Sequence, residues 1–232
     1  MAITQTPLHD QANLQLLDLI PQVSKVVEVG CSSGALANAY KQRYPETFYC
    51  GIEIDPNYAA SAQQYCDQVL VADLDALATC PSSSFLQAAC WVFGDCLEHL
   101  VDPWQVLNWV NQHQKISEVI CSCIPNSQHW SMQMSLSTGC WNYQESGLLD
   151  RTHLRFFTYE TIISLFSQAG YEVKSIKPRI TSQIPSSHIL DGIRSMAKAG
   201  GHDEEKMIDR ALPIQYLVVA EKIKHVDLVQ TQ

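Results

Sequence analysis

The order of apolar and polar residues predicts strands and helices that alternate along most of the chain. Short apolar runs, several rich in β-branched residues, are separated by segments in which apolar residues recur at helical spacing. Several runs are apolar at nearly every position, which suits strands buried on both faces of a parallel sheet. The predicted strands are residues 25–30, 48–54, 68–72, 88–93, 118–124, 172–177 and 215–222.

Helical spacing fills the intervals between these strands. Pro21 and Pro45 close two of the predicted helices, and Gly170 suits the C-cap of a third. Repeated alternation of strand and helix predicts an α/β fold, a doubly wound sheet with helices on both faces. The predicted helices are residues 8–20, 34–43, 56–66, a segment that ends near 114, 159–169, and 186–211 with an interruption at Gly200-Gly201.

Neither period continues between residues 125 and 158, where Ser, Trp, Gln, Asn and Gly are frequent. A loop of this length in a compact domain usually has a function. We therefore expect one domain over residues 1–222, a cap-like insertion at about 125–158, and a flexible tail at 223–232.

Composition limits the partners of the protein. Apolar residues make up 46% of the chain, charged residues 17%, and the net charge is −9. An acidic surface lacks the positive field that attracts nucleic acid or an anionic membrane, so we expect neither partner. The N-terminus lacks the pattern of a signal peptide, and no apolar run approaches the roughly 18 residues of a membrane span. We expect a soluble, cytoplasmic monomer or homodimer.

The cysteines indicate a reducing compartment. There are nine of them, an odd number, without a CxxC pair. Cys121 and Cys123 lie two positions apart in a predicted strand, so their side chains should point to the same face. We expect buried, reduced thiols.

The clearest chemical signal is the turn after the first predicted strand, VVEVGCSSG at residues 26–34. Gly30 permits a tight turn and leaves the backbone open to a ligand. A dinucleotide site requires G-x-G-x-x-G, but Ser32 and Ala35 occupy the second and third glycine positions. Glu28 suits a cationic ligand, such as the amino and sulfonium groups of S-adenosylmethionine (SAM).

This turn resembles the E/D-x-G-x-G-x-G motif of class I SAM-dependent methyltransferases, with Ser32 at the middle glycine. The resemblance implies a Rossmann-like, seven-stranded, mostly parallel sheet whose last strand is antiparallel. It also implies that Glu53 accepts the ribose hydroxyls, with Asp55 as the alternative, and that Asp73 faces the adenine amino group. The residues expected to bind SAM are Glu28, Gly30, Ser32, Gly34, Glu53, Ile54, Asp73, Leu74 and Gly94.

The segment FGDCLEHLVDP at residues 93–103 resembles the D-x-L-E-H-x-x-D-P segment of the branch that includes ubiquinone-biosynthesis O-methyltransferases. Asp95, Glu98 and His99 have the spacing of one helix face. Three interpretations remain open. His99 is a general base, or the trio holds a divalent ion, as proposed for an E-x-x-E-H cluster in some quinone methyltransferases, or Glu98 and His99 cap and pack the loop. We assign no metal ligands, and we expect SAM, converted to S-adenosylhomocysteine (SAH), as the cofactor.

The segment GLLDRTHLRFFT at residues 147–158 resembles the G-L-L-D-x-T-H-L-R-F-F-T segment of small-molecule methyltransferases. His153 is a candidate base or acceptor-positioning residue, and Asp150 a candidate to orient it. Arg155 is expected to bind an anionic acceptor or to pair with Asp150.

Other residues of the insertion have open roles. Pro125-Asn126 with His129 resembles a P-N-x-x-H segment of the same branch. The aromatic residues of the loop either line an acceptor site or hold the loop against the body. They are Trp130, Trp141 and Tyr143.

These signals predict transfer of a methyl group by direct displacement to an oxygen, less readily a nitrogen, of a small-molecule acceptor. The candidate catalytic residues are Asp95, His99 and His153. The alternative is a non-catalytic module with the methyltransferase fold, and a nicotinamide oxidoreductase is disfavoured by the missing glycines. Residues 203–205 (DEE) are expected to form a solvated helix start.

Overall fold

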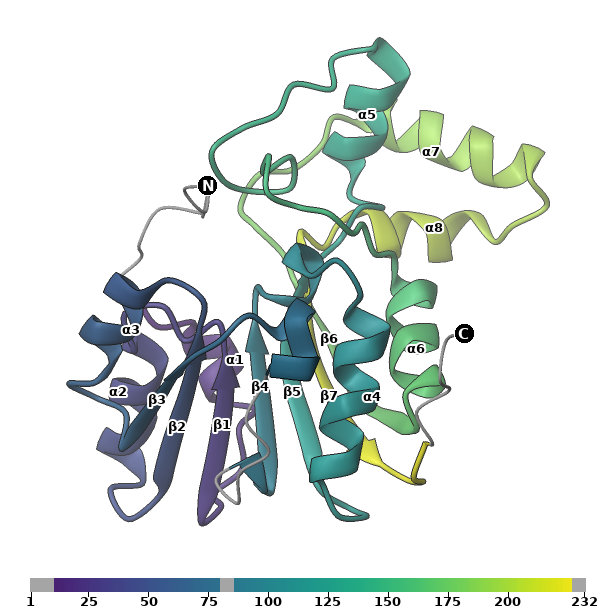
Figure 1. Cartoon of the computed structure of the whole chain (residues 1–232). Coiled ribbons are helices and arrows are strands. Elements are labelled where there is room, and N and C mark those ends of the chain that lie inside the picture. The colour runs from purple at the N-terminus through teal and green to yellow at the C-terminus, as the bar shows by residue number, and fades with distance from the viewer. Residues whose placement is uncertain (1–10, 80–85, 227–232) are drawn as a thin grey trace.

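The computed structural model describes residues 11–79 and 86–226, and one seven-stranded sheet forms its centre (Figure 1). The strand order is β3-β2-β1-β4-β5-β7-β6. Five strands from β3 to β5 pair in parallel, whereas β7 is antiparallel to both β5 and β6. The predicted fold, with its antiparallel last strand, is therefore confirmed. The strands are β1 (Lys25–Val29), β2 (Phe48–Glu53), β3 (Gln68–Val71), β4 (Cys90–Gly94), β5 (Val119–Pro125), β6 (Tyr171–Arg179) and β7 (Gln215–Lys222).

Helices cover both faces of the sheet, because neighbouring residues of each strand point to opposite sides. Val27 and Trp91 pack on the face covered by α4 and α6, and Val26 and Val92 pack on the face covered by α1, α2 and α3. Cys121 and Cys123 share the second face, as their spacing predicted. These helices are α1 (Leu14–Leu17), α2 (Ala35–Arg43), α3 (Pro56–Ala62), α4 (Pro103–His113) and α6 (Tyr159–Gln168), with short 3-10 helices η1 (Leu74–Thr79) and η3 (Leu97–His99).

The first predicted helix is shorter than expected. Residues 8–10 lie outside the described residues, and the helix that is described begins after the N-cap Asn13 and covers Leu14–Leu17. Leu16 and Leu17 are buried against the sheet, while Leu14 is exposed. One turn therefore suffices to bury the apolar residues of this segment.

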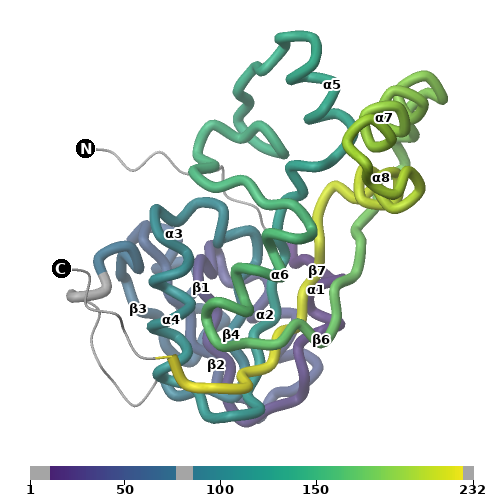
Figure 2. The backbone as a smooth tube through the Cα atoms, turned by 90° about the vertical axis from the view of Figure 1, so that its right-hand side faces the viewer, coloured from purple at the N-terminus to yellow at the C-terminus, as the bar shows by residue number. Residues whose placement is uncertain are grey.

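Three helices form a separate unit beyond the carboxyl ends of the parallel strands (Figures 1 and 2). They are α5 (Trp130–Thr138), α7 (Ser187–Ala199) and α8 (Glu204–Ala211). Their small common core contains Trp130 from α5, Ile193 from α7 and Ile208 from α8. We refer to these three helices as the helical unit.

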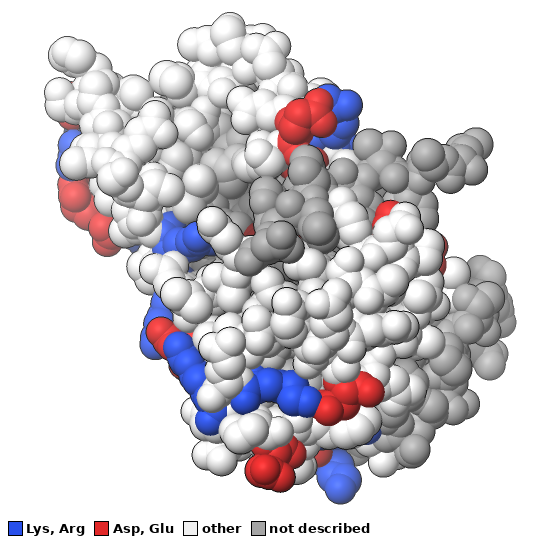
Figure 3. Space-filling view, turned by 90° about the vertical axis from the view of Figure 1, so that its left-hand side faces the viewer, with Lys and Arg blue, Asp and Glu red and all other residues white. Residues whose placement is uncertain are grey.

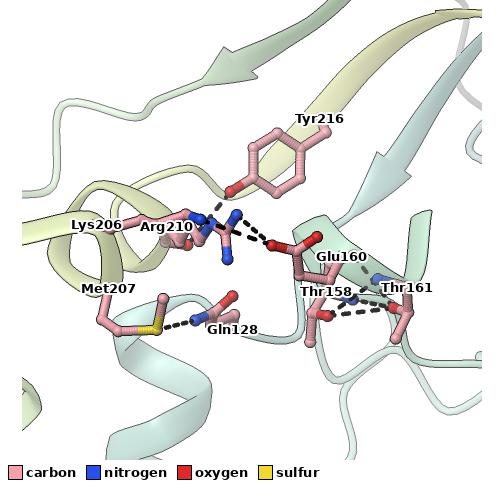
Figure 4. Close-up of polar contacts among 8 residues, drawn as sticks. All are labelled: Gln128, Thr158, Glu160, Thr161, Lys206, Met207, Arg210 and Tyr216. Atoms are coloured by element: carbon pink, nitrogen blue, oxygen red, sulfur yellow. Dashed lines mark hydrogen bonds and ion pairs between the residues drawn. The ribbon is translucent and has the colours of Figure 1, made fainter. Parts of the chain in front are cut away.

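The helical unit is joined to the body through α8 and α6. Figure 4 shows Arg210 and Glu160 pointing toward each other, with Arg210 Nη2 2.6 Å from Glu160 Oε1. The same guanidinium lies 4.4 Å from the ring centre of Tyr159. Below α5, Asn126 Nδ2 donates to the main-chain oxygens of Arg210 (2.8 Å) and Pro213 (2.7 Å). These contacts fix α8 over the end of the sheet.

The C-terminal segment continues the contacts of β7. Asn111 of α4 donates to the Lys224 oxygen at 2.9 Å and accepts from the Val226 nitrogen at 3.2 Å. Of the tail predicted at 223–232, residues 227–232 lie outside the described residues. No helix within residues 11–79 and 86–226 combines the length and apolar character needed to span a membrane.

Candidate active site

A cavity of about 910 Å³ opens at the carboxyl ends of the parallel strands. Residues that follow β1, β2 and β3 line one side of it, and residues that follow the central strand β4 extend toward the other. Arg179 at the end of β6, Gln215 at the start of β7 and residues 146–154 line the other. Because β7 is antiparallel, its first residue lies at the same sheet edge as the last residue of β6. The volume falls in the range of small-molecule sites.

The turn after β1 has the backbone conformation that the glycine motif predicted. Gly30, Ser32 and Gly34 have φ values of 69°, 49° and 82°, in the left-handed region where glycine is favoured. Ser32 therefore occupies a strained position, at a cost on the order of 1 kcal/mol. Gly30 and Ser32 line the cavity.

Gly34 has a different role from the one expected. It is absent from the described residues that line the cavity. A Cβ added to Gly34 would lie 3.0 Å from the Cα of Ala62. Glycine here therefore allows the start of α2 to pack closely against α3.

Glu53 connects the turns after β1 and β2. Its Oε2 accepts from the Ser32 nitrogen at 2.9 Å, and its Oε1 accepts from the Asp55 nitrogen at 3.0 Å. The side chain lines the cavity although the residue is only 4% exposed. Asp55 instead caps α3 by accepting from the nitrogens of Asn57 (2.7 Å) and Tyr58 (3.3 Å). Of the two acids considered from the sequence, Glu53 is therefore the one that faces the cavity.

Three further acids lie on this side of the cavity. Glu28 accepts a hydrogen bond of 2.9 Å from the Tyr49 hydroxyl, and burial raises the pKa of Glu28 well above its usual range. Asp73 accepts from the Asp75 nitrogen at 2.9 Å, and Asp75 accepts from the Val101 nitrogen at 2.9 Å. The loops after β3 and β4 are thereby joined. Ile54, Leu74 and Gly94 also line the cavity.

The opposite side contains a chain of hydrogen bonds that the sequence did not reveal. Arg179 Nη1 donates to Gln215 Oε1 at 2.6 Å, and Gln215 Nε2 donates to Asp95 Oδ1. Asp95 is exposed to the cavity, but desolvation by the surrounding protein raises its pKa, and a hydrogen bond with the Cys123 thiol and the positive charge of Arg179 oppose this rise. Strand position could have indicated Arg179 and Gln215, because the end of the sixth strand and the start of an antiparallel seventh strand meet at one sheet edge.

Asp95, Glu98 and His99 do not share one helix face, contrary to the expectation from their spacing. Asp95 has a φ of 54° and precedes η3, which begins at Leu97. Its side chain meets Gln215. Glu98 and His99 instead cluster with His153, and one ligand atom from each of these three lies within 4.8 Å of the others. Among the described residues, these three side chains form the only group of His, Cys, Asp or Glu that is close enough together to hold a metal ion.

The carboxylate of Glu98 is enclosed by protein. The residue is 1% exposed, and neither carboxylate oxygen has a hydrogen-bond partner among the described residues. Burial, and then the negative charge of Asp95, raises the pKa of Glu98 well above its usual range.

Both histidines of this cluster are held through Nδ1. His99 Nδ1 lies 3.2 Å from the Thr152 main-chain oxygen, and His153 Nδ1 lies 3.4 Å from the Leu148 oxygen. Burial and the nearby His99 lower the pKa of His153. The rings are 4.8 Å apart between centres.

Several other residues of the 125–158 segment lie outside the described cavity lining. Arg155 Nε donates to the Val101 oxygen at 2.9 Å, so its observed partner is a main-chain carbonyl and not Asp150. Trp130 lies in the core of the helical unit, Trp141 packs 6.0 Å from Phe156 between ring centres, and Tyr143 is 62% exposed. The three aromatic residues are absent from the described cavity lining.

Two other polar motifs cap helices. His129 is the N-cap of α5, with its Nδ1 3.3 Å from the Ser131 nitrogen. Asp203 is the N-cap of α8 and accepts from the Lys206 nitrogen at 2.9 Å. Asp203 and Glu205 are exposed, which confirms the solvated helix start.

The profile of a protein family described as "Methyltransferase domain" matches residues 7–176. The chain belongs to this family. It is a SAM-dependent methyltransferase, with SAM and SAH as the two forms of its cofactor. No curated protein sequence matches this methyltransferase.

Solved structures share the fold of the methyltransferase at low sequence identity. A SAM-dependent methyltransferase from Thermotoga maritima, described as a possible histamine N-methyltransferase, is 16% identical with a TM-score of 0.61, over 91% of this chain and 90% of that chain. A Haloferax volcanii chain in complex with the Trm112 methyltransferase activator is 17% identical with a TM-score of 0.59, over 91% and 88%. The plantazolicin methyltransferase BamL, in complex with a triazolic desmethylPZN analogue and SAH, is 12% identical with a TM-score of 0.57, over 90% and 80%.

Proposed function

We propose that the methyltransferase transfers the methyl group of SAM to a hydroxyl oxygen of a small-molecule acceptor held in the 910 Å³ cavity. The observation that supports this best is the pair of histidines, His99 and His153, in the lining of that cavity. The imidazoles come from the loop after β4 and from the 146–154 segment, and we place the acceptor beside them. A hydroxyl acceptor gains more from such bases than an amine that is already nucleophilic when neutral.

The donor side fits a cationic nucleoside. Glu28, Glu53 and Asp73 bring three carboxyl groups to one end of the cavity, next to the exposed backbone of Gly30 and Ser32. A carboxylate accepts two hydroxyl hydrogens from a ribose, and acidic groups favour a ligand that carries amino and sulfonium charges. We assign SAM binding to Glu28, Gly30, Ser32, Glu53, Ile54, Asp73, Leu74 and Gly94, with Gly34 supporting the turn.

SAM, when bound, supplies a methyl group on a cationic sulfur, which is a good leaving group. The chain therefore has to position the acceptor oxygen, exclude water and remove one proton. His99 and His153 each use Nδ1 toward a main-chain oxygen, which leaves Nε2 able to take the proton. Asp95 opens to the same space and is the third group able to do so.

The acceptor enters between the glycine turn and residues 146–154, which come from the 125–158 insertion. We propose that this insertion acts as a cap together with α7 and α8. A small molecule fits a cavity of this volume, and the solved methyltransferase BamL is in complex with a triazolic desmethylPZN analogue and SAH. Among the described residues that line the cavity, Arg179 is the only lysine or arginine. Its positive charge at the end of β6 would favour an anionic group on the acceptor.

The proposal is tested by incubating the enzyme and SAM with each member of a library of hydroxyl- and amine-bearing metabolites and measuring the release of SAH. We expect turnover with at least one hydroxyl compound, and a fall in kcat of about 100-fold or more in His99→Gln or His153→Gln. His188→Gln changes an exposed histidine of α7 and serves as the matched control. Activity restricted to amines, or full turnover in both cavity variants, would contradict the assignment.

A further inference from the structure

We infer that Glu98, His99 and His153 bind one divalent cation of the zinc type on the acceptor side of the cavity. The observation that leads to this site is Glu98. Glu98 is 1% exposed. Both of its carboxylate oxygens are buried, and neither has a hydrogen-bond partner among the described residues. Buried carboxylates are normally hydrogen-bonded, paired or bound to a metal, because desolvation without compensation is costly. The groups beside this carboxylate are two imidazoles.

The two imidazoles are oriented as metal ligands are. A main-chain oxygen only accepts hydrogen bonds, so Nδ1 of His99 donates to the Thr152 oxygen (3.2 Å), and Nδ1 of His153 faces the Leu148 oxygen (3.4 Å) in the same sense. A neutral imidazole that donates at Nδ1 has its lone pair on Nε2. Metal-bound histidines are typically fixed in this way through their second nitrogen.

A further layer of hydrogen bonds supports His99. The Thr152 hydroxyl lies 3.1 Å from His99 Nδ1 and donates to Asp150 Oδ1 at 2.6 Å. Asp150 also accepts from the Thr152 nitrogen at 2.8 Å. The Asp150–Thr152 turn therefore fixes the His99 ring, as supporting residues do around metal ligands.

The ligand set and spacing favour zinc over magnesium or calcium. One carboxylate and two imidazoles form a set used by catalytic zinc sites, which leave further positions open. Magnesium and calcium prefer sites made of oxygen atoms alone. The three ligand atoms lie within 4.8 Å of one another, and two ligands of one tetrahedral zinc ion are about 3.4 Å apart. Binding therefore requires the side chains to close by at most about 1.4 Å, which rotamer adjustment can supply.

The site differs from the Asp95–Glu98–His99 trio suggested by spacing along the sequence. Asp95 is turned to Gln215, and His153 from the 146–154 segment completes the cluster instead. That segment is already attached at the same residue, because the nitrogens of Leu154 and Arg155 donate to the Glu98 main-chain oxygen at 2.8 and 2.9 Å. A cation here would join the loop after β4 to the cap. With the cation bound, Nε2 of both histidines would be coordinated and could no longer take a proton. In the metal-bound protein the cation would lower the pKa of an acceptor hydroxyl bound to an open position, and Asp95 of the same lining would take the proton.

Binding of zinc is measured on the full chain in the Cys140→Ser background, since the exposed Cys140 thiol is an alternative zinc ligand. The protein is first freed of metal with a chelator. Calorimetry should then give one Zn²⁺ per chain, with micromolar or tighter affinity. We expect Glu98→Gln, His99→Gln and His153→Gln each to weaken binding by about 100-fold or more, and His188→Gln to have no effect. Mg²⁺ should not compete at millimolar concentration.

Thermal unfolding gives a second readout. Zn²⁺ should raise the Tm of the parent protein and leave that of Glu98→Gln unchanged. The metal-free Glu98→Gln protein should unfold at a higher temperature than the metal-free parent, because the substitution removes a buried charge. No stoichiometric Zn²⁺ binding, or unchanged binding in Glu98→Gln, would overturn the inference.

This inference depends on the proposed function only in assigning the cation to the acceptor side. The two can fail separately. SAH binding and methyl transfer that persist in chelator would leave the proposed function intact and reject a catalytic metal. Zinc binding without any binding of SAH would do the reverse.

Discussion

At the scale of single residues, one backbone angle separates two acids that are close in sequence. Asp95 has a φ of 54°, so its side chain does not continue the face formed by η3 and instead accepts a hydrogen bond from Gln215. Glu98, three positions later, is enclosed beside His99 and His153. The spacing along the sequence predicted a shared helix face, but spacing carries no information on a single left-handed residue before a short 3-10 helix.

Glu53 is the residue whose substitution tests the donor site most directly. Glu53→Gln removes the charge that would accept the ribose hydroxyls, and we expect the Kd for SAH to rise about 10- to 100-fold. Asp55→Asn is the control, because Asn also serves as an N-cap for α3 and Asp55 does not line the described cavity. Calorimetry with SAH measures both. Equal affinities for Glu53→Gln and the parent would exclude Glu53 from donor binding.

His129 makes stability depend on pH. Burial lowers its pKa to about 4, from about 6.5 in an unfolded chain. The unfolded state therefore binds more protons than the folded state between these values, and stability is lost as the pH falls through this window. The expected loss from this residue between pH 7 and pH 5 is about 2 kcal/mol.

His129→Asn isolates that effect, because Asn is also a good N-cap for α5 and does not titrate. Urea unfolding at pH 7 and pH 5 gives the two free energies for each protein. The variant should lose about 2 kcal/mol less than the parent over this interval. Parallel losses in both proteins would show that His129 is not the responsible group.

At the scale of elements, the helix α5 shows what the hydrophobic pattern misses. Its sequence WSMQMSLST lacks a continuous apolar stripe, and only Trp130 and Met132 of the helix are buried. The ends are nevertheless marked, by His129 at the N-cap and by Gly139 with a φ of 71°. The helix is held by its caps and by contact with α7 and α8, which a local pattern does not record.

The attachment of α8 rests on Asn126, which is 0% exposed. Asn126→Ala removes two hydrogen bonds to the oxygens of Arg210 and Pro213 and leaves both carbonyls without these donors. We expect the free energy of unfolding to fall by about 2–4 kcal/mol. Differential scanning calorimetry measures the change.

Glu160→Gln is the matched control on the same contact between α8 and the body. The Glu160 side chain is 62% exposed, so water can replace its contact with Arg210 and the expected loss is at most about 1 kcal/mol. If the Asn126 variant lost no more than this, α8 would be held chiefly by its apolar contacts.

At the scale of the whole molecule, the fold was more predictable from the sequence than the site. A buried parallel strand such as β1 can be recognised in the sequence because its residues form an almost continuous apolar run. The glycine turn is then recognised because it directly follows this strand. Arg179 and Gln215 could not be recognised in this way, because they are 36 positions apart and meet only through strand order. His153 likewise joins Glu98 only through the path of the cap.

The surface agrees with the composition. On the face drawn in Figure 3, basic side chains lie beside acidic ones, without a broad field of positive charge. Ion pairs such as Lys41–Asp67 and Arg43–Asp18 neutralise such cations locally.

Donor binding should stabilise the entire domain. A ligand at 100 times its Kd adds about 2.7 kcal/mol to the stability of the folded state, which corresponds to a rise in Tm of about 5–10 °C for a chain of this size. Differential scanning fluorimetry with SAH should show this shift, and NAD at the same concentration should not. A shift with NAD alone would reject the assignment of the glycine turn to a sulfonium nucleoside.

During synthesis, the C-terminal edge of the sheet is necessarily finished last. Within the described sheet, β6 pairs with β7 alone, and β7 separates β6 from β5. A nascent chain can therefore assemble β1 to β5 while β6 still has no neighbour. Gln215, which connects Arg179 to Asp95, emerges from the ribosome later still. The nucleoside end of the cavity is thus able to form before the opposite wall.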